Sequence, residues 1–84
     1  MPIPDNITRK HILRAIARID KEGVPKNRKI RKYYCEYEMK KYPPKLLISY
    51  ANVFANKEEL DWSPKVFNTY MAQKYLESKE FKIN

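Results

Sequence analysis

The stretch YPPKLLISYANVFA, residues 42–55, decides the fold of this chain. It opens on two prolines, and proline is tolerated in the first turn of a helix because its fixed φ is close to helical and its missing N–H would have no partner there. After the prolines, apolar residues recur at helical spacing. The expected core face comprises Leu47, Tyr50, Ala51 and Phe54, flanked by Leu46, Ile48 and Val53. The polar residues form one narrow stripe, Lys45, Ser49 and Asn52. The pattern therefore predicts a central, mostly buried helix that runs to about Ala55.

Upstream, residues 8–22 carry a second helical pattern. Thr8 is a suitable N-cap, and Gly23 followed by Pro25 predicts the end of the helix. The apolar face comprises Ile12, Leu13, Ile16 and Ile19. The opposite face carries a basic stripe, Lys10, Arg14, Arg18 and Lys21. Such a stripe is either an ordinary solvated helix surface or a row of phosphate contacts, and the sequence leaves both interpretations open.

The remaining segments predict a small sheet and a third helix. Residues 33–42, YYCEYEMKKY, alternate with β-favouring aromatics and predict a short hairpin that turns near Met39 and Lys40. Ser63 and Pro64 predict the start of a helix that continues to Leu76, and residues 81–83 alternate as a last strand. The sequence thus predicts one α+β domain over residues 1–84, with three helices packed on a short β-hairpin plus a C-terminal strand.

Charge and composition narrow the function. Eighteen Lys and Arg against ten Asp and Glu give a net charge of +8, which favours a polyanionic partner, with nucleic acid ahead of acidic membranes or acidic proteins. One His, one Cys and one Gly are too few for a multi-Cys/His zinc site or a glycine-rich phosphate loop. We therefore expect a binding protein and not an enzyme, without cofactor or metal. No apolar run approaches a membrane span, so we expect a cytoplasmic protein that does not bind membranes.

The positive charge is concentrated in one part of the chain. Residues 26–32 hold five basic side chains, and residues 26–45 hold eight basic and two acidic ones, together with several tyrosines and two prolines. Basic groups attract phosphate whatever the base sequence, and aromatic surface beside them can receive an apolar or stackable group. A nuclear-localisation tract is the alternative for residues 26–32, and packing in the core is the alternative for the tyrosines.

The chain resembles a known protein family. The order ITRKHILRAIARIDKEGVP (residues 7–25), a basic loop, and KYYCEYEMKKYPPKLLISYANVFANKEELD (residues 32–61) is similar to the sulfur-binding domain of McrA-type, modification-dependent restriction endonucleases. The resemblance covers roughly residues 3–83. In that family the domain is α+β and binds DNA whose backbone carries a phosphorothioate. The sulfur lies in a small apolar pocket among basic residues.

The resemblance implies a role for particular residues. Tyr42 and Pro43 are expected to form the wall of the sulfur pocket, which Leu46 completes. The residues expected to contact the flanking phosphates are Arg28, Lys29, Arg31, Lys32, Lys45 and Ser49. An apolar pocket favours sulfur because the oxygen that it replaces is more strongly hydrated and costs more to bury without a hydrogen-bond partner. Relatives are commonly joined to an HNH nuclease domain, whose metal ligands this chain lacks, so any cleavage is expected from a separate nuclease chain.

Two other functions share the same basic surface. The chain is expected to bind double-stranded DNA with a preference for phosphorothioate, but a general DNA- or RNA-binding protein would show the same charge pattern. A protein-interaction subunit that docks an acidic partner would also carry a basic face rich in tyrosine.

Overall fold

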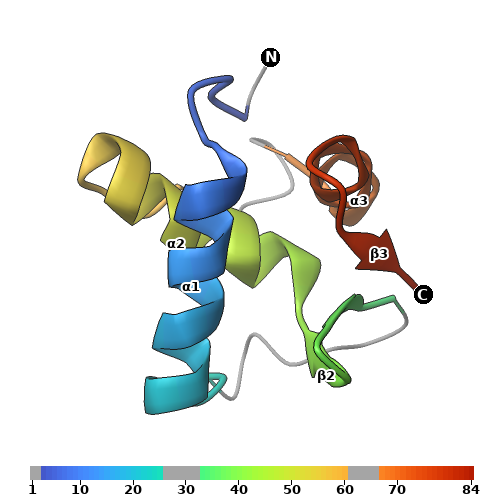
Figure 1. Cartoon of the computed structure of the whole chain (residues 1–84). Helices are drawn as coiled ribbons and strands as arrows, with labels where there is room; N and C mark the ends of the chain where they lie inside the picture. The colour runs from blue at the N-terminus through green and yellow to red at the C-terminus, as the bar shows by residue number, and fades with distance from the viewer. Residues whose placement is uncertain (1–2, 26–32, 61–66) are drawn as a thin grey trace.

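The computed structural model describes residues 3–25, 33–60 and 67–84, which form three helices and a three-stranded antiparallel sheet (Figure 1). The elements follow in the order α1 (Arg9–Glu22), β1 (Cys35–Tyr37), β2 (Lys40–Tyr42), α2 (Pro44–Asn56), α3 (Thr69–Ser78) and β3 (Lys82–Ile83). Both α1 and α3 pack against α2, and β3 follows directly after α3 (Figure 1). The predicted α+β architecture is confirmed.

Helix α1 begins and ends where its sequence signals predict. The Thr8 hydroxyl accepts a hydrogen bond from the backbone N–H of His11, and the His11 ring accepts one from the backbone N–H of Thr8 at 3.0 Å. This reciprocal pair is a capping box in which histidine replaces the usual Glu or Gln. Gly23 ends the helix with φ 84°, a region that favours glycine, and its N–H donates to the Ile19 carbonyl at 2.7 Å. The buried face is Ile12, Ala15, Ile16 and Ile19.

The hairpin turns one residue earlier than predicted. Glu38 and Met39 occupy the turn with φ of 48° and 67°, and the strands pair so that Glu36 lies opposite Lys41. Positive φ at both central residues matches the twist of the two strands, although glycine or asparagine would adopt it with less strain. Strand β3 pairs with the other edge of β1, which gives the order β2-β1-β3.

Helix α2 is the centre of the core, as predicted. Pro44 occupies its first turn, and the helix is buried on almost every side through Asn52. Leu46 and Ile48, which the sequence placed beside the core face, are as deeply buried as Leu47. A helix covered on more than one side buries residues outside a single apolar stripe, and here α1 and α3 both pack on it. Phe54, in the last turn, is 37% exposed, so its predicted place in the core face is wrong.

The polar stripe of α2 holds the segment that follows the helix. The Ser49 hydroxyl donates to the Leu60 carbonyl at 2.9 Å, and the Asn52 amide donates to the Glu58 carbonyl at 2.8 Å. Both side chains are buried. Because a buried polar group is costly without a partner, these bonds explain why two polar residues are tolerated in the core.

Helix α3 begins later than predicted. The predicted N-cap Ser63 and Pro64 lie outside the described residues, but Phe67 and Asn68 precede the helix instead of continuing it. The Asn68 side chain accepts a hydrogen bond from the Met71 N–H at 2.8 Å and is the observed N-cap. Phe67 is buried at 1% exposure just before this cap, so the core contact and the Asn68 cap together fix where the helix starts.

Arg9 connects the first turn of α1 to the end of α3. Its Nη1 donates to the carbonyls of Lys79 at 2.9 Å and Glu80 at 3.2 Å, and its guanidinium lies 4.5 Å from the centroid of the Phe81 ring. A cation at the C-terminal end of a helix satisfies carbonyls that have no partner within the helix. Arg9 therefore stabilises the fold.

In the described ranges, no helix is long and apolar enough to cross a membrane.

Candidate nucleic-acid interface

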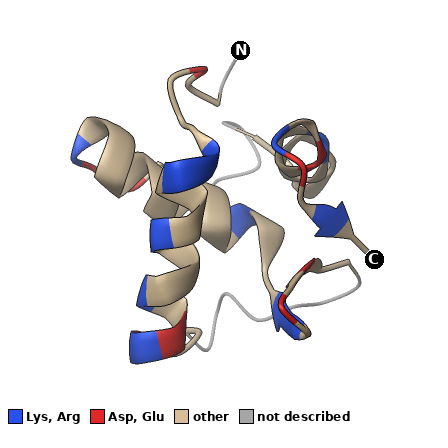
Figure 2. Cartoon of the chain, in the orientation of Figure 1, with Lys and Arg blue, Asp and Glu red and all other residues tan. Residues whose placement is uncertain are grey.

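Three cations project from the outer face of α1. Lys10, Arg14 and Lys21 are all exposed, and Figure 2 shows basic positions along the whole length of this helix. Within the described part of the chain, none of the three takes part in an ion pair or a cation–π contact. At 1.5 Å per residue, they extend over about 16 Å of helix axis. We call Lys10, Arg14 and Lys21 the α1 basic row.

Arg18, the fourth member of the predicted stripe, is held within the protein. Its Nε lies 3.4 Å from Oε1 of Glu22, and its guanidinium carbon lies 3.9 Å from the centroid of the Tyr50 ring. Only 27% of its side chain is exposed. Arg18 therefore fastens α1 to α2 and is a weaker candidate for contact with an external anion than its neighbours.

The carboxylates at the end of α1 also have partners. Asp20 accepts a hydrogen bond from the Tyr42 hydroxyl at 2.7 Å and lies 3.8 Å from the Lys40 ammonium. Glu22 pairs with Arg18. Each carboxylate next to the α1 basic row is thus partly neutralised, which reduces the repulsion that an approaching phosphate would meet.

The residues predicted to form a sulfur pocket are buried. Tyr42 is 3% exposed and Leu46 is fully buried, and Pro43 between them is buried too. Burial, followed by the hydrogen bond to Asp20, raises the pKa of Tyr42 above its ordinary value. The structure brings the three residues together where α2 begins, and all three are buried there. Their contact with sulfur stays a prediction.

The predicted phosphate contacts are placed differently from one another. Arg28, Lys29, Arg31 and Lys32 lie outside the described residues. Lys45 is partly exposed, with its ammonium 4.9 Å from the centroid of the Phe67 ring. Ser49 is fully buried and its hydroxyl donates to the Leu60 carbonyl, so the structure places it in the core.

Sequence reasoning missed the role of Asp20. It stands 22 positions before Tyr42, and no local pattern connects the two residues. The contact joins the end of α1 to the last residue of β2, and Lys40 at the start of the same strand reinforces it. Only the packing of α1 against the hairpin and α2 reveals this pair.

The lone histidine and the lone cysteine have structural surroundings. His11 belongs to the capping box of α1, and Cys35 is fully buried in β1. Burial raises the pKa of the Cys35 thiol from 9.0 to about 11. Since only the thiolate reacts readily, a buried thiol with this pKa is poorly suited to nucleophilic chemistry.

We expect Cys35 to react slowly in the folded protein. A rise of the pKa from 9.0 to about 11 lowers the thiolate fraction at pH 8 about a hundredfold, and burial slows access further. Modification by 5,5′-dithiobis(2-nitrobenzoate) should therefore be at least about a hundredfold slower in native protein than in urea-unfolded protein at the same pH. Similar rates in the two states would contradict the buried position of the thiol.

Comparison with protein-family models, with curated proteins and with solved structures gave no match to this chain.

Proposed function

We propose that this chain binds nucleic acid through the sugar-phosphate backbone, with double-stranded DNA as the principal ligand. The observation that carries the proposal is the α1 basic row, in which Lys10, Arg14 and Lys21 are exposed and have no ion-pair partner among the described residues. Cations without internal partners bind phosphate without first breaking a contact within the protein. Contacts of this kind position a protein on DNA but do not read its base sequence.

The dimensions of the row suit a nucleic-acid strand. Its length of about 16 Å is close to the axial length of five nucleotides in one strand of B-DNA, at about 3.4 Å each. The sequence adds five more basic residues at positions 26–32, between the end of α1 and the start of β1. With a net charge of +8 on 84 residues, electrostatic attraction also speeds the encounter with a polyanion.

Preference for a phosphorothioated backbone is a separate prediction that rests on the resemblance to sulfur-binding domains. Tyr42, Pro43 and Leu46, the residues expected to form the sulfur pocket, are buried in the described structure. The proposed function is therefore backbone binding, and sulfur selectivity is tested beside it.

The test is a salt titration of binding to a fluorescently labelled duplex. If about five phosphates are neutralised, log K should fall against log salt concentration with a slope of about −4.5, which is roughly a 500-fold loss of affinity between 50 and 200 mM salt. Fluorescence anisotropy measures both quantities. The same duplex with a phosphorothioate linkage tests sulfur selectivity, and an RNA duplex tests the choice of nucleic acid.

Polyglutamate serves as the control for a non-specific acidic partner. Binding to polyglutamate as tight as to DNA would favour a protein-interaction subunit instead. Absence of DNA binding at 50 mM salt, or a slope near zero, would remove the proposed function.

A further inference from the structure

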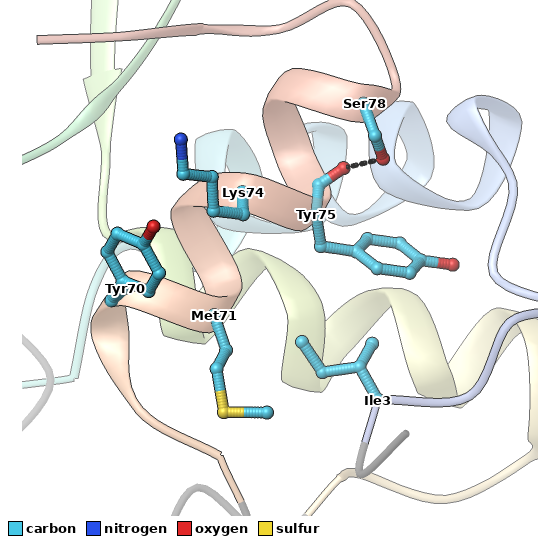
Figure 3. Close-up of a pocket in the computed structure, with 6 residues that line it drawn as sticks. All are labelled: Ile3, Tyr70, Met71, Lys74, Tyr75 and Ser78. Carbon is cyan, nitrogen blue, oxygen red and sulfur yellow. Dashed lines mark hydrogen bonds between the residues drawn. The ribbon is translucent and has the colours of Figure 1, made fainter.

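A pocket of about 340 Å³ opens beside α3 (Figure 3). Its lining residues are Ile3, Tyr70, Met71, Lys74, Tyr75 and Ser78. Among the residues that the structure describes, all of the lining but Ile3 comes from α3, and none belongs to the α1 basic row. The volume is within the lower part of the range typical of small-molecule sites.

Two of the four side-chain polar groups of the described lining already have hydrogen-bond partners. The Tyr75 hydroxyl lies 2.8 Å from the carbonyl oxygen of Ile7 and 3.1 Å from that of Pro4. The Ser78 hydroxyl donates to the Tyr75 carbonyl at 2.5 Å (Figure 3). A molecule in the pocket would therefore meet mainly the apolar surfaces of Ile3, Met71 and the tyrosine rings.

Lys74 is the basic residue of the lining within the described part of the chain. Lys74 is exposed, and its ammonium lies 5.5 Å from the centroid of the Tyr70 ring, which is itself on a side chain 64% exposed (Figure 3). No carboxylate of the described residues forms an ion pair with Lys74. A positive charge beside an apolar pocket is complementary to a ligand that has an apolar body and one negative charge.

We propose that this pocket binds a small amphipathic monoanion, with a hydrocarbon body in the pocket and its single anionic group at Lys74. A nucleotide or a peptide fits less well, because base edges and peptide groups lose hydrogen bonds to water when buried. Lys74 and the Tyr70 hydroxyl are the polar groups of the lining that make no hydrogen bond or ion pair within the described residues. The inference does not depend on DNA binding.

The test uses two fluorescent probes that differ in charge. 1-Anilinonaphthalene-8-sulfonate carries one sulfonate, and N-phenyl-1-naphthylamine has the same rings without it. We expect the native protein to bind both probes. Lys74→Ala should lower the affinity only for the sulfonate probe, by roughly two- to fivefold. Tyr70→Ala should weaken both probes by about tenfold, because it removes one apolar wall. Lys74→Arg should retain the affinity of the parent protein.

Lys82→Ala is the matched control, since it removes the same charge from an exposed position outside the pocket. It should leave both affinities unchanged. All titrations are made where circular dichroism shows native protein, because the sulfonate probe also binds loosely packed states. Equal losses in Lys74→Ala and Lys82→Ala, or no binding of the neutral probe, would overturn the proposal. Decanoate, an amphipathic monoanion, and adenosine monophosphate are compared as competitors of the two probes. If adenosine monophosphate displaced both probes as well as decanoate does, the assignment of a hydrocarbon body would be overturned.

Discussion

Replacing Lys10 and Arg14 together by glutamine is expected to weaken the binding of duplex DNA about sixtyfold at 0.1 M salt. Each phosphate contact contributes about 0.9 to the slope of log K against log salt, so two lost contacts should reduce the slope by about 1.8. At 0.1 M salt, one decade below the 1 M reference, a difference of about 1.8 in the slope lowers log K by about 1.8, which is the roughly sixtyfold loss of affinity. Both side chains point away from the core, so the variant should retain its fold.

The matched control is the double variant Lys57→Gln with Lys82→Gln. Both double variants reduce the net charge from +8 to +6, but Lys57 caps α2 and Lys82 lies in β3, so neither belongs to α1. Anisotropy titrations of both double variants at several salt concentrations then distinguish binding through α1 from attraction that depends only on net charge. If the two double variants lost affinity equally, net charge alone would account for binding and α1 would not be the interface.

Tyr42→Ala is expected to lower the free energy of unfolding by about 3–5 kcal/mol, as is typical when a large buried aromatic side chain is truncated. A domain of this length has a total of roughly 4–13 kcal/mol, so the variant should lose a large part of its stability. The reason is structural: Tyr42 is 3% exposed, and its hydroxyl donates to Asp20 at 2.7 Å. Urea denaturation followed by circular dichroism measures the change.

Tyr42→Phe separates the ring from the hydroxyl. It should cost only about 0.5–1.5 kcal/mol, because the ring still fills the core and Asp20, with 40% of its side chain exposed, regains water. A loss of less than 1 kcal/mol in Tyr42→Ala would contradict the buried position of this residue. If the protein prefers phosphorothioate, Tyr42→Ala or Pro43→Ala should remove the preference, provided that circular dichroism shows a folded variant, because each removes part of the expected apolar wall.

The parent protein and Tyr42→Phe should also differ in stability at alkaline pH. The folded state raises the pKa of Tyr42 above its ordinary 10.0 and so holds the phenol proton more tightly than the unfolded chain does. The resulting stabilisation is complete below pH 10 and is lost progressively as the pH rises above it. Tyr42→Phe should remove this part of the alkaline loss, whereas the parts due to Cys35 and Tyr75, whose pKa values are also raised, should remain.

The proposed interface was only partly predictable from the sequence. Helical spacing placed Lys10, Arg14, Arg18 and Lys21 on one face, and the structure agrees with that placement. Helical spacing could not distinguish Arg18, which contacts Glu22 and the Tyr50 ring, from the exposed members of the stripe. The periodicity of a helix reports which side chains share a face, but the contacts of that face depend on a different part of the chain.

By itself, the sequence determined the α+β class, the limits of α1 and the central position of α2. These features depend on signals that act within a few residues: the apolar spacing of each segment, the Thr8 cap, Gly23 at the end of α1, and the two prolines that open the α2 segment. Such signals work through backbone geometry and local hydrogen bonds, so they can be recognised without knowledge of the rest of the fold.

The tertiary structure alone decided which polar and aromatic side chains the core absorbs. Ser49 reaches the Leu60 carbonyl, Tyr42 reaches Asp20, and Arg9 reaches two carbonyls beyond α3, each across many positions of the chain. A tyrosine or a serine is chemically suited both to an interface and to a satisfied place in the core. Its environment is fixed only when segments distant in sequence pack together and either cover it or leave it in water.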